Sequence, residues 1–183
     1  CSNRQPEIAQ LRLEAGAAVD QAEDGGATPL YIACQQGHVE CAQLLLEAGA
    51  AVDQAPNHGT TPLFIACQKG HLESAQLLLE AGASVSPPRE NGVTPRFSAC
   101  QEGHVEIVRL LLEASAAVDQ ADEDGTTPLH MACEEGNLEV TRLLLEVGAE
   151  VNQAADDGAT PLYLACDFGH LEVAKLLSSY GAS

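Results

Sequence analysis

The stretch that decides the fold is residues 59–83, which read GTTPLFIACQKGHLESAQLLLEAGA. Thr61 suits a helix N-cap, and Pro62 suits the first helical position, where its missing N–H leaves no bond unmade. Gly70 is the residue type that ends helices in the left-handed conformation. Beyond it, apolar residues return every three or four positions, as they do on the buried side of a helix. The stretch therefore predicts two short helices separated by a tight turn.

The same stretch recurs along the whole chain with a period of 33 residues. Thr-Pro pairs begin at residues 28, 61, 94, 127 and 160, and six of the seven cysteines lie at residues 1, 34, 67, 100, 133 and 166. A fixed period of this size indicates an array in which each unit buries its apolar side against its neighbours. We expect one domain over residues 1–183, with an N-terminal half-repeat cap at 1–20 and repeats at about 21–53, 54–86, 87–119, 120–152 and 153–183.

A helix, a tight turn, a second helix and a long loop at this period resemble the ankyrin repeat. The family's Thr-Pro-Leu-His-x-Ala motif is complete at residues 127–132, and a Gly-His pair recurs before the second helix in four repeats, with Asn137 in place of His once. The resemblance implies an all-α solenoid of helix-turn-helix units with projecting loops or hairpins. It also implies that the histidines of the Gly-His pairs bond the backbone between repeats, and that His130 bonds the Thr127 hydroxyl or the nearby turn.

The periodic cysteines predict a structural position in the core. Helices of neighbouring repeats pack about 8–10 Å apart, whereas the Cα atoms of a disulfide lie within about 7 Å. The chain has no Cys-x-x-Cys pair, so the thiols are expected to act as small buried hydrophobes rather than as metal ligands. No catalytic set or phosphate-binding loop stands out, and we expect no enzyme, no metal and no cofactor. Persisting free thiols indicate a reducing, intracellular compartment, most simply the cytoplasm.

The charge balance narrows the class of partner. The formal net charge is −19, from 27 acidic and 8 basic residues. Nucleic acid and anionic membranes are disfavoured, because both require stripes of Lys and Arg. No apolar run approaches the ~20 residues of a membrane span. We expect a protein or peptide partner, and a monomer when the domain is isolated.

The resemblance also implies where a partner binds. In ankyrin domains, partners contact the loop tips and the exposed positions of each first helix, which line the concave face. On this chain the candidate residues are Asp24, Tyr31, Gln35, Gln36, Asn57, His58, Gln68, Lys69, Glu90, Asn91, Arg96, Gln101, Glu102, Glu123, Asp124, Glu134, Glu135, Asp156, Asp157, Asp167 and Phe168. The last two repeats are sharply acidic here and the first two are mixed. This pattern predicts a groove for a Lys/Arg-bearing peptide; the alternative is an acidic surface that only keeps the chain in solution.

The third repeat departs most from the pattern. Arg96 replaces a buried leucine, and Ser115 replaces the glycine that ends the second helix. A buried, unpaired arginine is costly, so we expect Arg96 to reach solvent or to pair with Glu90, Glu102 or another carboxylate. Two interpretations remain open at this point. One is drift in a tolerant array, and the other is a distortion that turns Arg89, Arg96 and Phe97 toward a ligand.

The leading functional prediction is a non-catalytic protein–protein interaction module. One alternative is a regulatory or spacer segment of a larger enzyme, channel or signalling protein, because the chain opens in the middle of a repeat without a methionine. Another alternative is an engineered or consensus-like scaffold, suggested by the absence of insertions between repeats. The irregular third repeat counts against that second alternative.

Overall fold

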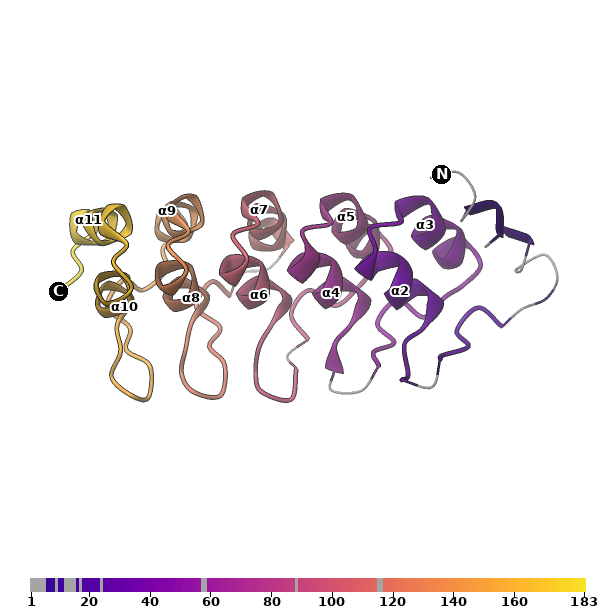
Figure 1. Cartoon of the computed structure of the whole chain (residues 1–183), viewed down its shortest axis with the longest axis horizontal. Coiled ribbons are helices and arrows are strands. Elements are labelled where there is room, and N and C mark those ends of the chain that lie inside the picture. Colours follow the sequence, from indigo (N-terminus) through magenta and orange to yellow (C-terminus); the bar gives the residue numbers. More distant parts are fainter. Residues whose placement is uncertain are drawn as a thin grey trace. The chain divides into compact units, whose positions relative to one another are not determined.

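The computed structural model describes residues 6–8, 10, 11, 16, 18–23, 25–56, 59–87, 89–114 and 117–183. In these ranges the regular elements are helices and there is no strand. The helices come in pairs, one pair to each repeat, with a long loop leading from one pair to the next (Figure 1). The predicted all-α helix-turn-helix architecture is confirmed. Much of the predicted N-terminal cap, residues 1–20, falls outside the described residues.

Each repeat contributes a first and a second helix. The first helices are α2 (Pro29–Gln35), α4 (Pro62–Lys69), α6 (Pro95–Gln101), α8 (Pro128–Glu134) and α10 (Pro161–Asp167). The second helices are α3 (Val39–Glu47), α5 (Leu72–Glu80), α7 (Val105–Ala114), α9 (Leu138–Glu146) and α11 (Leu171–Ser179).

The Thr-Pro pairs start the first helices as predicted. Each threonine is the N-cap, and its hydroxyl oxygen accepts a hydrogen bond from the backbone N–H three residues on. The N···O distance at Thr61 is 3.2 Å. In the fourth repeat the His130 side chain also bonds back to the Thr127 backbone N–H, which makes a reciprocal capping box. These caps satisfy donors that a helix start otherwise leaves open.

The chain divides into two compact units, Cys1–Pro87 and Pro88–Ser183. In the first unit, α2 packs on α4 and α3 packs on α5. In the second unit, α8 packs between α6 and α10, and α9 packs between α7 and α11. Each unit is thus a row of first helices beside a row of second helices. The boundary lies at the start of the third repeat.

We call a set of equivalent positions, spaced 33 residues apart along the chain, a slot. A few slots supply the residues of the core. The cysteine slot is buried at Cys34, Cys67, Cys100 and Cys133, and these thiols are free. Cys166, in the last repeat, is exposed, which indicates that the following repeat covers this slot. Cys41 is also buried. The prediction that the periodic cysteines serve as core residues is confirmed for the four buried members.

Side-chain bonds to the backbone join consecutive repeats within a unit. The Nε2 atom of His71 donates to the carbonyl oxygen of Gln35 at 3.2 Å, and that of His170 donates to Glu134 at 2.7 Å. Asn137 stands in for the histidine and donates to two such carbonyls at 2.9 and 2.8 Å. The expected role of these residues is confirmed, and the acceptors are the last carbonyls of the preceding first helix.

A second set of bonds, which the sequence reasoning missed, follows an aspartate slot. The carboxylates of Asp20, Asp53 and Asp119 each accept from a backbone N–H 31 residues later, at 3.1 to 3.3 Å. Asn152 occupies the same slot and accepts from Ser183 at 3.0 Å. The signal in the sequence that could have predicted these bonds is the recurrence of an acidic or amide residue directly after a valine.

Arg96 does not follow the expectation for it. Its side chain is buried, with 3% of the residue exposed, and its guanidinium donates to the carbonyl oxygens of Leu111, at 3.1 Å, and Ala117. The prediction that it reaches solvent is therefore wrong, and backbone carbonyls rather than Glu90, Glu102 or another carboxylate accept its hydrogen bonds. A carbonyl of α7 and one of the loop that follows it supply the acceptors instead. Burial lowers the pKa of Arg96, although the nearby Asp119 carboxylate opposes this.

In the part of the chain that the structure describes, no helix combines the length and the apolar character that crossing a membrane would require.

Candidate functional site

The candidate partner-binding residues lie on the loop tips and at the ends of the first helices, and most of those in the second unit are exposed. The exposed members are Glu90, Asn91, Glu102, Glu123, Asp124, Glu135, Asp156, Asp157, Asp167 and Phe168, and Gln101 and Glu134 are half-buried. We call this set of twelve residues the acidic surface. In the first unit, Gln36 and Lys69 are exposed, while Tyr31, Gln35 and Gln68 are half-buried. Asp24, Asn57 and His58 lie outside the described residues.

Arg96 was predicted among these residues and is the exception. Its guanidinium is buried against the end of α7, so it presents no charge to a partner in this structure. Phe97 is buried as well, with 5% exposed. The hypothesis that the third repeat turns Arg89, Arg96 and Phe97 toward a ligand is therefore wrong for Arg96 and Phe97.

Backbone bonds connect successive loop tips in the second unit. The Glu123 N–H donates to the Asn91 carbonyl at 3.2 Å, and the Asp156 N–H donates to the Asp124 carbonyl at 3.0 Å. Asp122, which is not among the candidate partner-binding residues, shapes its loop by accepting from the N–H groups of residues 124 and 126 at 3.0 and 2.9 Å. The tips are therefore held in register, and the carboxylates at 123, 124 and 156 are carried on connected backbone.

The ends of the first helices are held in a similar way. Because His170 bonds the Glu134 carbonyl, the end of α8 is fixed to the start of α11 in the next repeat. Two bonds from Asn137 fix the end of α6 to the start of α9. The acidic side chains that follow these helix ends thus project from positions with little backbone freedom.

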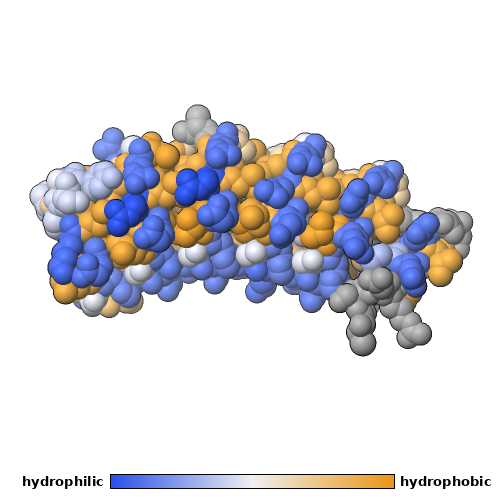
Figure 2. All heavy atoms as spheres, turned by 90° about the horizontal axis from the view of Figure 1, so that it is seen from above, coloured by the Kyte–Doolittle hydropathy of each residue, from blue (hydrophilic) through white to orange (hydrophobic). Residues whose placement is uncertain are grey.

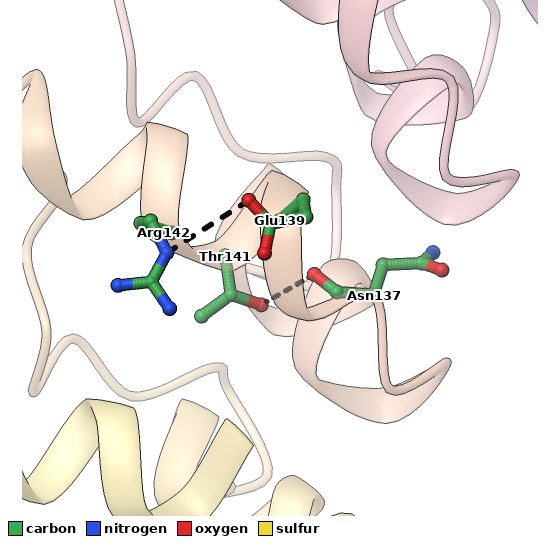
Figure 3. A network of polar contacts seen from close by, with 4 residues as sticks. All are labelled: Asn137, Glu139, Thr141 and Arg142. Carbon is green, nitrogen blue, oxygen red and sulfur yellow. Dashed lines mark hydrogen bonds and ion pairs between the residues drawn. The ribbon is translucent and has the colours of Figure 1, made fainter. Parts of the chain in front are cut away.

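On the second helices of the second unit, unlike on the acidic surface, basic side chains lie beside acidic ones. Arg109, Arg142 and Lys175 each lie 2.8 to 3.8 Å from the glutamate three residues earlier on the same helix. Figure 3 shows the pair on α9, where a dashed line joins the Nε atom of Arg142 to the Glu139 carboxylate. Figure 2 looks onto the second helices, where hydrophilic side chains are separated by apolar ones. The cations of the last three second helices therefore have carboxylate partners on their own helix.

From Glu123 onward, the acidic surface has no comparable cation among the described residues of its unit. Apart from those three paired cations, the basic residues of Pro88–Ser183 are Arg89 and Arg96. Arg96 is buried. Arg89 lies beside the first loop tip, where its backbone N–H donates to the Val93 carbonyl at 2.9 Å. The carboxylates of the acidic surface from Glu123 onward consequently have no cationic partner among the described residues.

The buried cysteine thiols and the buried His130 are poorly suited to act as catalytic groups. Burial raises the pKa of the Cys34 and Cys133 thiols to about 12, so neither supplies a thiolate. Burial lowers the pKa of His130, whose Nδ1 lies 2.7 Å from the Thr127 hydroxyl and whose Nε2 donates to the Ala159 carbonyl at 3.2 Å. The described residues contain no group of three or more potential metal ligands.

Comparison with known proteins agrees with this architecture. The family model for ankyrin repeats matches in three copies, at residues 1–88, 85–155 and 120–183. The chain therefore belongs to the ankyrin-repeat family. Ankyrin repeats are generally protein–protein interaction modules and are typically non-catalytic. A search of curated proteins gave no match.

Proposed function

We propose that this chain is a non-catalytic module that binds a Lys/Arg-bearing segment of a partner protein on its acidic surface. The observation that carries the proposal is the segregation of charge in the second unit. Glu106, Glu139 and Glu172 on the second helices pair with cations on their own helices, whereas the carboxylates of the loop tips and first-helix ends from Glu123 onward have no such cation. Packing does not require this difference, because both groups of carboxylates are exposed apart from the half-buried Glu134.

An uncompensated row of carboxylates has a defined physical effect. Exposed charges of one sign add to a potential that attracts a cationic segment before contact and raises its association rate. The fixed backbone beneath Glu123, Asp124 and Glu135 lowers the entropy lost when a partner docks. The same potential repels phosphate, so a nucleic acid is the wrong partner. The buried free thiols fit a reducing compartment such as the cytoplasm.

The test is a titration of the full chain with a fluorescein-labelled peptide of alternating lysine and glycine, followed by anisotropy. The test variant carries Glu123→Gln, Asp124→Asn, Glu134→Gln and Glu135→Gln. The matched control removes the same charge from the second helices through Glu106→Gln, Glu139→Gln, Glu146→Gln and Glu172→Gln. We expect the test variant to bind about tenfold more weakly at low salt. The control should stay within about twofold of the parent chain.

Salt provides an independent criterion. Because exposed charges are screened over about 8 Å at 0.15 M ionic strength, affinity should fall steadily as salt is raised through that value. Equal losses in the test and control variants would mean that net charge alone attracts the peptide. That result, or affinity insensitive to salt, would refute a binding role for the acidic surface.

A further inference from the structure

Phe168 is an aromatic residue in a slot that otherwise holds polar side chains. It is the C-cap of α10, and 53% of the residue is exposed. The same slot holds Gln36, Lys69, Glu102 and Glu135 in the other repeats, and all four are exposed. The fold therefore accepts a charged or amide side chain at this point, and packing does not account for the phenyl ring.

The exposure of Tyr163, another aromatic residue of the last repeat, has a different origin. Tyr163 is 58% exposed, but its slot is buried at Phe64, Phe97 and His130. The slot faces the repeat that follows, as the bond from His130 to the Ala159 carbonyl demonstrates. Tyr163 thus lies in a slot that the next repeat covers at Phe64, Phe97 and His130, whereas Phe168 lies in a slot that solvent reaches in every repeat.

Carboxylates are the nearest charged neighbours that the sequence and packing give to Phe168. Asp167 directly precedes it and is exposed. One repeat earlier, α8 packs on α10 and ends in Glu134, followed by the exposed Glu135. Adjacent packed helices lie about 8–10 Å apart, and the bond from His170 to the Glu134 carbonyl holds these two helix ends together. A hydrophobic ring is therefore placed among negative charges.

The chemistry that fits a ring beside carboxylates is a planar cation. The face of an aromatic ring attracts a cation, and arginine does this while it also offers a fork of N–H donors to a carboxylate. A purely aliphatic partner would desolvate the neighbouring carboxylates without compensation. A purely electrostatic site would not need the ring, since a glutamate at this slot would add charge.

We propose that Phe168 is the anchor for an arginine side chain of the partner, which stacks on the ring while Asp167 and Glu135 hold its charge. This inference rests on the proposed function and makes it more specific, because it selects arginine over lysine at one position of the bound segment. The other carboxylates of the acidic surface attract the remaining basic residues without discriminating between them.

The experiment compares two labelled peptides, one of alternating arginine and glycine and one of alternating lysine and glycine, on the full chain. The variants are Phe168→Gln, which installs the residue found at Gln36, together with Phe168→Leu and Phe168→Trp. Tyr163→Gln is the matched control, because Tyr163 is similarly exposed. Circular dichroism establishes that each variant is folded.

We expect the parent chain to prefer the arginine peptide, and Phe168→Gln and Phe168→Leu to weaken its binding about fivefold while changing the lysine peptide less. Phe168→Trp should retain or improve binding, and Tyr163→Gln should leave it unchanged. Full affinity in Phe168→Leu would overturn the stacking inference, as would equal losses for both peptides. Those results leave the proposed function standing. If neither peptide binds the parent chain at low salt, the proposed function itself fails.

Discussion

Arg96 and Ser115 are predicted to be a compensating pair. In the other repeats the last turn of the second helix is closed by a backbone bond across a glycine. For example, the Ala83 N–H donates to the Leu78 carbonyl at 2.9 Å, and Gly82 between them has a φ of 86°. A residue with a side chain resists that conformation, so this closure depends on glycine.

The third repeat has serine at the glycine position. The carbonyl equivalent to that of Leu78 belongs to Leu111, and it accepts a hydrogen bond from the Arg96 guanidinium at 3.1 Å. Arg96 thus supplies a donor to the same acceptor from a different element. We predict that Arg96→Leu destabilises the chain when Ser115 is present, and that it is neutral or stabilising when Ser115 is replaced by glycine.

The magnitude follows from the two bonds and the burial. Hydrogen bonds that involve a charged group contribute about 1.5–3 kcal/mol each, and Arg96 makes two of them to backbone carbonyls. Burying a leucine in its place returns about 1.5–3 kcal/mol. The net cost of Arg96→Leu is then about 2 kcal/mol, which for a cooperative unit near 100 residues lowers Tm by on the order of 10 °C.

The assay is urea unfolding followed by circular dichroism at 222 nm, on the parent chain, both single variants and Arg96→Leu/Ser115→Gly. The expected coupling energy is about 2 kcal/mol, well above the ~0.5 kcal/mol within which independent substitutions add. Leu129→Arg serves as a control, because Gly148 already closes its repeat and the new guanidinium would be buried without need. Additive effects, or stabilisation by Arg96→Leu with Ser115 retained, would refute the compensation.

Three further predictions concern single slots. Because burial lowers the pKa of His130 from its usual 6.5, the unfolded chain takes up a proton before the folded chain as pH falls below 6.5. The parent chain should therefore lose stability relative to His130→Phe in that pH range. Urea midpoints of the two proteins that run parallel from pH 7.5 to 5 would contradict this. Gly136→Ala should lower the free energy of unfolding by about 2–3 kcal/mol, since its Cβ would meet the His170 Nδ1 at 2.5 Å. Gly169→Ala, which has open space and a similar φ, should lower it by about 1 kcal/mol. Equal thermal shifts for the two variants would show that the contact with His170 relaxes freely. Cys166→Ala should remove one rapidly reacting thiol in a native Ellman assay, and the same change at a buried cysteine should remove none.

The sequence predicted most of the architecture because the repeat presents each local signal five times. A Thr-Pro pair starts every first helix, and a glycine with positive φ follows each one, at Gly37, Gly70, Gly103, Gly136 and Gly169. Local rules for caps and turns sufficed for these elements. The burial of the cysteines also followed from the period, since a slot that recurs must have the same neighbours.

The environment of Arg96 could not be predicted in the same way. Its acceptors belong to Leu111 and Ala117, on the second helix of its own repeat and the loop beyond. Sequence reasoning looked for a charged partner, since carboxylates are the usual partners of a buried arginine. The missing glycine was the signal in the sequence, but connecting positions 96 and 115 required the geometry of the helix pair.

Arg96 and Phe168 are both departures from the repeat, and the structure separates them into two kinds. Arg96 lies in a buried slot, where a change must be balanced by neighbours or the repeat loses stability, and its bonds to α7 provide that balance. Phe168 lies in a slot that is exposed in every repeat, where the fold places no demand on the side chain. A departure from the repeat in a buried slot indicates compensation by neighbouring residues. A departure in an exposed slot, where the fold permits any side chain, indicates selection by something outside the chain. By this reasoning the partner's chemistry should be sought at Phe168 and the carboxylates around it, rather than at the more conspicuous third repeat.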